Sequence, residues 1–277
     1  MFLTTYKTTI KNLVRSITFW LTVAVVLIVI IQGALDGFYL DDSDSAFVLE
    51  YKEYVQCIIN SCASKMLMYA MPIFAVVSVV LVLNRDYGDK FFEIEKSAGI
   101  KPSSYLLGRV VALISVNLIV LLIMNAFCLH LYVFTRGGVE GMTVGQYLAD
   151  SSVRLLRTDL LVGMPSLIFY IGLTYCIGSI FKNGVPAAFV AIGYVIAFYA
   201  CNLMFRHRVA EEYFDYYSPI PRMLRQYFHY YDTEWFEEML EMVNTSLSKV
   251  VFCIAFLVGV AVLCSAVSYL RIRKREV

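Results

Sequence analysis

Long stretches without a single charged residue constrain the fold of this chain more than any other feature of its sequence. Six such stretches occur, each of 19 to 26 residues. A helix of about 20 apolar residues crosses the ~30 Å hydrocarbon core of a bilayer, so each stretch is long enough to span a membrane. The sequence therefore predicts an all-α integral membrane protein with six spans, at about 16–35, 66–84, 110–135, 160–181, 185–205 and 250–270.

The composition excludes most other classes of protein. Apolar residues make up 60% of the 277 residues and charged residues 16%, with a mean hydropathy of +0.69. Soluble domains contain about 45–50% apolar residues and about 25% charged residues. The composition therefore excludes a disordered chain, a collagen-like chain and an ordinary soluble enzyme. The first apolar stretch exceeds the ~7–15 residues of a signal-peptide core, and we expect it to be retained as an anchor. We therefore expect a single transmembrane domain, 1–277.

The distribution of charge predicts the orientation. The net charge is only +1, from 23 basic and 22 acidic residues, without the basic excess of a nucleic-acid-binding protein. The segments 1–15, 85–109, 182 and 271–277 carry 13 basic residues in 48 positions. The opposite segments 36–65, 136–159 and 206–249 carry 10 basic residues in 98 positions. The first group of segments is denser in basic residues and includes both ends of the sequence. Because basic residues favour the cytoplasmic side, both termini should be cytoplasmic.

Residues 1–15 have the spacing of an amphipathic helix. Lys7, Lys11 and Arg15 form a basic line at four-residue intervals. The apolar side comprises Phe2, Tyr6, Ile10, Leu13, Val14 and Ile17. Such a helix lies in the membrane interface with its bases near anionic headgroups. The alternative interpretation is a plain basic flank of the first span.

The longest cytoplasmic loop, Arg85–Arg109, predicts a short helix, a break and a new helix. Gly99 suits the end of the short helix, and Pro102 suits the first turn of the next one. The short helix, Asp89–Ser97, has Phe91, Phe92 and Ile94 as apolar residues and Glu93, Glu95 and Lys96 as polar residues. Exposed phenylalanines on such a loop require a cover, either lipid or a protein partner.

This loop resembles the cytoplasmic loop of the ABC type-2 permease family, the six-span membrane subunits of ATP-binding-cassette exporters. The resemblance lies in Gly88, the short helix, Ala98-Gly99-Ile100 and Tyr105-Leu106-Leu107-Gly108-Arg109. Asp89 stands where the family usually has Thr or Ser, and Arg109 stands where it has Lys. The amphipathic segment 1–15 is similar to the family's connecting helix, and Lys182-Asn183-Gly184 to its second coupling element.

The resemblance implies a multi-pass permease of a bacterial cell membrane. In the family, the helix between spans two and three is a coupling helix that docks on a separate ATP-binding cassette subunit, which carries ATP-Mg. The second partner implied is another permease, either a copy of this chain or a paralogue. The coupling interface would comprise Asp89, Lys90, Phe91, Phe92, Glu93, Ile94, Glu95, Lys96, Ser97, Ala98, Gly99 and Ile100.

No motif predicts chemistry or a cofactor in the chain itself. The P-loop pattern Gly-x4-Gly-Lys-Ser/Thr is absent from the sequence, so ATP hydrolysis would need a partner. The three histidines, His130, His207 and His229, lie outside the depths of the spans, and His-Glu-x-x-His is absent, so no catalytic or metal site is predicted. A structural or signalling membrane protein and an intramembrane enzyme are the alternative classes.

Several further residues carry smaller expectations. The outer aromatic segment 206–249 predicts short helices that form a lid or contact substrate. It resembles the short re-entrant or interfacial helices that the ABC type-2 permease family carries between spans five and six. Asn117 and Asn125 lie deep in the third span, where an interhelical hydrogen bond is expected rather than a substrate contact. Cys57 and Cys62, at an i, i+5 spacing, point apart on a helix and are expected to remain unbridged. Close helix packing is expected at Gly172, Gly178 and Gly193.

Overall fold

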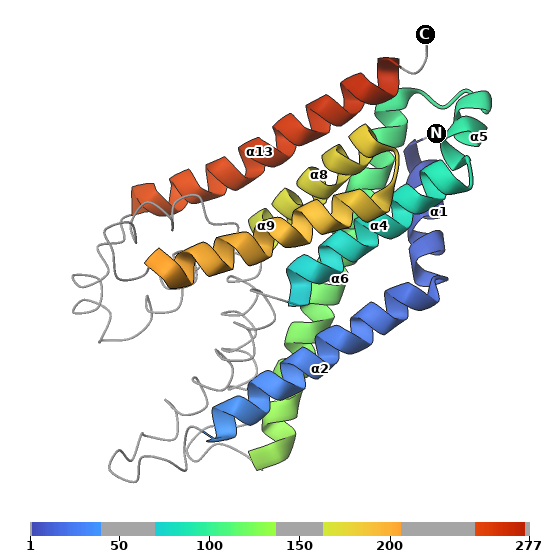
Figure 1. The fold of residues 1–277 in the computed structure, drawn as a ribbon. Coiled ribbons are helices and arrows are strands. Elements are labelled where there is room, and N and C mark those ends of the chain that lie inside the picture. The colour runs from blue at the N-terminus through green and yellow to red at the C-terminus, as the bar shows by residue number, and fades with distance from the viewer. Residues whose placement is uncertain (1, 40–69, 137–162, 206–246, 275–277) are drawn as a thin grey trace.

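The computed structural model describes residues 2–39, 70–136, 163–205 and 247–274, and in these ranges all regular secondary structure is helical (Figure 1). The helices are α1 (Phe2–Val14), α2 (Ile17–Tyr39), α4 (Met71–Gly88), α5 (Phe91–Ser97), α6 (Pro102–Arg136), α8 (Met164–Phe181), α9 (Gly184–Phe205) and α13 (Leu247–Arg273). The all-α prediction is confirmed for these ranges. The outer segment 206–249, apart from its last three residues, and the pair Cys57 and Cys62 lie outside them.

Four of the described helices are long and apolar enough to cross a membrane: α4, α6, α8 and α13. Helices α1 and α2 meet at a bend of 67° and count as a fifth crossing element if the pair is one span. Helix α9 contributes a shorter apolar stretch, Gly184–Tyr194. Several apolar helices therefore fit a multi-pass membrane protein, and the count of six spans stays a prediction.

Helix α8 lies at the centre of the described bundle, where it packs against α4, α9 and α13. It can occupy this position because its apolar residues cover all of its sides. Small residues allow the closest approaches. A Cβ atom on Gly172 would lie 3.0 Å from the Cα atom of Ala261 in α13, and one on Gly178 would meet the side chain of Leu83 in α4. Close packing is thus confirmed at these two glycines. The expectation is wrong for Gly193, where a Cβ atom would meet no atom of the described residues within 4 Å.

The start of α1, the end of α13 and the short helix α5 lie at one end of the bundle (Figure 1). We call this the α5 end. It is the end that the charge distribution predicts to be cytoplasmic. Helices α4 and α6 run from α5 into the bundle, so α5 is the connection between two candidate spans.

The predicted pattern of helix, break and helix is confirmed in the described loop, with revised boundaries. Helix α5 begins at Phe91, after Lys90 in a left-handed conformation (φ 55°), rather than at Asp89. It ends in a Schellman motif, in which Gly99 (φ 77°) donates its N–H to the carbonyl of Lys96 and Ile100 donates to that of Glu95. Helix α4 continues through Gly88, so part of the predicted loop is helical.

The turn between α8 and α9 is as tight as the sequence predicts. Lys182 takes a left-handed conformation (φ 57°), and the Asn183 side chain accepts a hydrogen bond from the N–H of Val185 at 2.9 Å. The N–H of Gly184 donates to Asn84 Oδ1 in α4 at 3.1 Å. The turn is therefore fastened to α4 as well as to its own helices.

Candidate functional site

A cluster of polar and charged side chains is buried at the α5 end, between α1, α4, α5 and α6. Its centre is Arg109 of α6, whose side chain is 2% exposed. We use the name Arg109 cluster for Arg109, for its hydrogen-bond partners Thr9, Asp86 and Glu95, and for Thr5, which donates a hydrogen bond to Glu95. The sequence predicts Asp86 in the loop before the short helix, whereas the structure places it in α4. Arg109 lies in α6, the helix that the sequence predicts to begin near Pro102.

Arg109 joins three other helices through one guanidinium group. Its Nη1 donates to Thr9 Oγ1 in α1 at 2.7 Å, and its Nη2 donates to Asp86 Oδ1 in α4 at 2.7 Å. The same Nη2 donates to Glu95 Oε1 in α5 at 3.3 Å. Only a planar guanidinium offers donors in enough directions for such a junction, and a lysine ammonium is a point charge.

The buried side of α1 carries two threonines, whereas the sequence interpretation of this segment singles out only its apolar side and its basic line. The buried residues of α1 are Thr5, Thr9 and Leu13, spaced four apart. Thr5 packs against Gly108, where an added Cβ atom would lie 2.9 Å from Thr5 Cβ. Thr5 Oγ1 donates to Glu95 Oε2 at 3.3 Å. Because α6 presents a glycine and an arginine here, the small hydroxyl side of α1 fits it better than its large apolar side.

Two neighbouring residues of α5, Ile94 and Glu95, differ from the sequence interpretation. Ile94, grouped with the apolar residues, is 56% exposed, and Glu95, grouped with the polar residues, is buried. Glu95 is buried because it pairs with the buried guanidinium of Arg109. An ion pair lowers the free-energy cost of burying the two charges, and removal of either partner leaves a buried charge without compensation. Glu93 and Lys96, which the sequence interpretation groups with the polar residues, are exposed, and so is Lys90 just before the helix.

The other residues of the predicted coupling interface lie mostly on the surface of the α5 end. Asp89 and the segment Ser97–Gly99 are exposed, and Ile100 is half-buried. Phe91 and Phe92 form the first turn of α5, and their side chains lie outside the described part of the structure. The interface residues are thus gathered on one short segment, with Glu95 turned toward Arg109.

Tyr105 covers the cluster from within α6. The guanidinium carbon of Arg109 lies 5.1 Å from the centre of the Tyr105 ring, a cation–π geometry. Gly108 directly precedes Arg109 and Tyr105 lies four residues before it, while Thr5 and Thr9 share one side of α1. The only sequence signals for the cluster were therefore this threonine spacing and the close approach that Gly108 permits.

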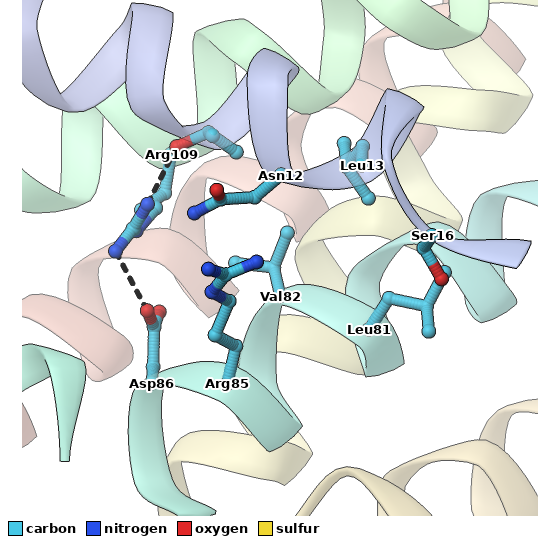
Figure 2. A pocket seen from close by; sticks show the side chains of 9 residues that line it. Asn12, Leu13, Ser16, Leu81, Val82, Arg85, Asp86 and Arg109 are labelled. Carbon is cyan, nitrogen blue, oxygen red and sulfur yellow. Dashed lines mark hydrogen bonds and ion pairs between the residues drawn. The ribbon is translucent and has the colours of Figure 1, made fainter. Parts of the chain in front are cut away.

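A cavity of about 110 Å³ lies beside the cluster, at the bend between α1 and α2. Asn12 reaches into it from α1, and Arg85 reaches toward Asn12 from α4 (Figure 2). Its walls include Arg109 and Asp86 on one side and Leu81 and Leu13 on the other. The cavity therefore joins a charged region to an apolar region.

The described residues contain no group of three or more metal-ligating side chains. Deeper in the bundle, Asn117 Nδ2 of α6 donates to Ser78 Oγ of α4 at 3.1 Å, which confirms the interhelical hydrogen bond expected there. The side chain of Asn125 lies outside the described residues. Comparison with family models and with curated proteins gives no match to this chain.

Proposed function

We propose that this chain is the membrane-spanning permease subunit of an ABC transporter that exports its substrate. ATP-Mg would be bound and hydrolysed on a separate ATP-binding subunit, docked on Asp89–Ile100. The six spans would be α2, α4, α6, α8, α9 and α13, with both termini in the cytoplasm of a bacterial cell. A second permease, a copy or a paralogue, would complete the pathway. The observation that carries this proposal is a short surface helix joined by buried ion pairs to two candidate spans.

Helix α5 has the properties expected of a docking element. Seven residues are too few to form a stable helix alone, so its position depends on the contacts that hold it. Those contacts include the Schellman motif at its end, the ion pair between Glu95 and Arg109, and the hydrogen bond from Thr5 to Glu95. On the outer side, exposed Ile94 lies beside exposed Glu93 and Lys96, and such a mixed surface suits a protein partner.

The Arg109 cluster would carry displacement of α5 into the membrane. Glu95 is joined to Arg109 in α6, and Arg109 is joined to Asp86 in α4. A partner that moves α5 as it closes on ATP would therefore pull on both candidate spans and, through Thr9, on α1. No described side chain of the cluster needs to react for this role, which agrees with the absence of a nucleotide motif from the sequence.

Co-purification in mild detergent tests the proposal. We expect a P-loop ATPase to purify with the chain in stoichiometric amount. Glu93→Ala and Phe92→Ala should each weaken this association about tenfold, the effect of removing a well-placed interface side chain, while leaving the chain folded. They should also uncouple ATP hydrolysis from transport.

Lys101→Ala is the matched control, since Lys101 is exposed and lies just outside the proposed interface. It should leave the association unchanged. Full retention of the ATPase in both the Glu93 and Phe92 variants would contradict docking on α5. Stoichiometric capture of a partner without a P-loop would instead support a structural or signalling role.

A further inference from the structure

We infer that the cavity at the bend between α1 and α2 binds the phosphate group of a membrane phospholipid. This inference does not depend on transport, and requires only that α1 lies at the surface of the membrane that the apolar helices cross. It concerns residues outside the proposed docking segment, chiefly Asn12 and Arg85.

The cavity has the size and the donors for an oxyanion. At about 110 Å³ it far exceeds the ~10–15 Å³ needed by one water molecule. The side-chain nitrogen of Asn12 is buried and donates no hydrogen bond within the described part of the chain. Arg85 brings a guanidinium group to the same space (Figure 2). An amide N–H₂ and a guanidinium are both donors to phosphate oxygens, and the charged one binds more strongly.

The charges that line the cavity match a phosphodiester. Its walls carry two guanidinium groups, from Arg85 and Arg109, and one carboxylate, from Asp86, a surplus of one positive charge. Glu95 pairs with Arg109 but does not line the cavity. A phospholipid diester carries one negative charge on its phosphate, which the two guanidinium groups of the lining would face.

The position of the cavity fits a lipid better than a soluble anion. Its lining changes from charged residues to Leu13, Leu81 and Val82, as a lipid changes from headgroup to acyl chain. Trp20, which donates to the carbonyl of Val14 at 2.8 Å across the bend, is exposed, and tryptophan favours the headgroup level. The exposed bases Lys7, Lys11 and Arg15 of α1 would attract anionic headgroups to the same plane.

Native mass spectrometry of the full-length chain in detergent tests the site. We expect phosphatidylglycerol to be retained at a ratio of one, and diacylglycerol with the same acyl chains, which lacks the phosphate, to be lost. Arg85→Gln should weaken retention about tenfold, and Asn12→Leu, of nearly equal volume, by about threefold. Arg85→Lys should restore most of the binding.

Arg15→Gln is the matched control, because it removes an exposed positive charge from the same region without altering the cavity. Equal weakening by Arg15→Gln and Arg85→Gln would overturn the site in favour of unspecific attraction. Retention of diacylglycerol as strong as that of phosphatidylglycerol would overturn it as well. Displacement of the lipid by millimolar inorganic phosphate would overturn the lipid as the source of the phosphate group. Asn12→Leu retains every charge, so it stays informative if Arg85→Gln fails to fold.

Discussion

Helices α8 and α13 are held together by close apolar packing, whereas α1, α4, α5 and α6 are held together by buried charged and hydroxyl side chains. At the first contact the backbone of α13 approaches Gly172 so closely that a Cβ atom would lie 3.0 Å from Ala261 Cα. At the second, one guanidinium group lies 2.7 Å from both Thr9 Oγ1 and Asp86 Oδ1. Both contacts bring helices together, but by different interactions.

The difference follows from the surroundings of each contact. In lipid, helices gain little from burying apolar surface, so small residues that allow close van der Waals contact hold α8 and α13 together. At the α5 end, four elements of different lengths must meet at one point, and directional hydrogen bonds fix their relative positions. The apolar contact therefore provides packing, and the Arg109 cluster provides a specific geometry that a moving partner could act on.

Removal of Arg109 should have the largest effect. Arg109→Met would leave the buried carboxylates of Asp86 and Glu95 without their counter-charge, a change that typically costs about 3–5 kcal/mol. We expect a large drop in the midpoint of thermal unfolding in detergent. Arg109→Lys should fall in between, because an ammonium keeps the charge but cannot reach all three partners. Lys101→Met is the control, and an unchanged midpoint in Arg109→Met would show that the cluster does not hold the α5 end together.

The apolar contact should break at a smaller cost. Gly172→Val would force α8 and α13 apart, since the new side chain meets backbone atoms of Ala261, and overpacking of this kind costs about 1–3 kcal/mol. Gly193→Val is the matched control in α9, where an added Cβ atom meets nothing within 4 Å. Unfolding in a denaturing detergent measures both variants, and equal effects would contradict the close approach of α8 and α13.

The hydrogen bond between Asn117 and Ser78 should have the smallest effect and so sharpen the comparison. Interhelical hydrogen bonds in membrane proteins contribute about 0.6 kcal/mol on average. A double-mutant cycle of Asn117→Ala and Ser78→Ala, measured by the same unfolding assay, should give a coupling energy of this order. A coupling as large as the loss in Arg109→Met would mean that polar contacts deep in the bundle matter as much as the Arg109 cluster.

Local features of the fold could be predicted, and the cluster could not. Absence of charge locates the apolar helices. Gly99 marks the end of α5, Pro102 marks the start of α6, and Lys182-Asn183-Gly184 predicts the tight turn. Each of these signals lies within a few residues of the feature that it predicts. Glu95 and Arg109 are 14 residues apart, and Thr9 and Arg109 are 100 apart. Charged residues are usually solvated, so the burial of Glu95 and Arg109 depends on tertiary pairing that no local pattern encodes.

A photo-reactive amino acid at position 94 tests most directly whether α5 docks on a separate ATPase. Ile94 on α5 is 56% exposed, and Leu107 on α6, 59% exposed, provides a control at a nearby position outside the docking segment. After irradiation of living cells, we expect the position 94 variant to be cross-linked to a P-loop ATPase identified by mass spectrometry, and the position 107 variant to be free of it. Cross-linking of the ATPase at neither position, or equally at both, would contradict docking on α5.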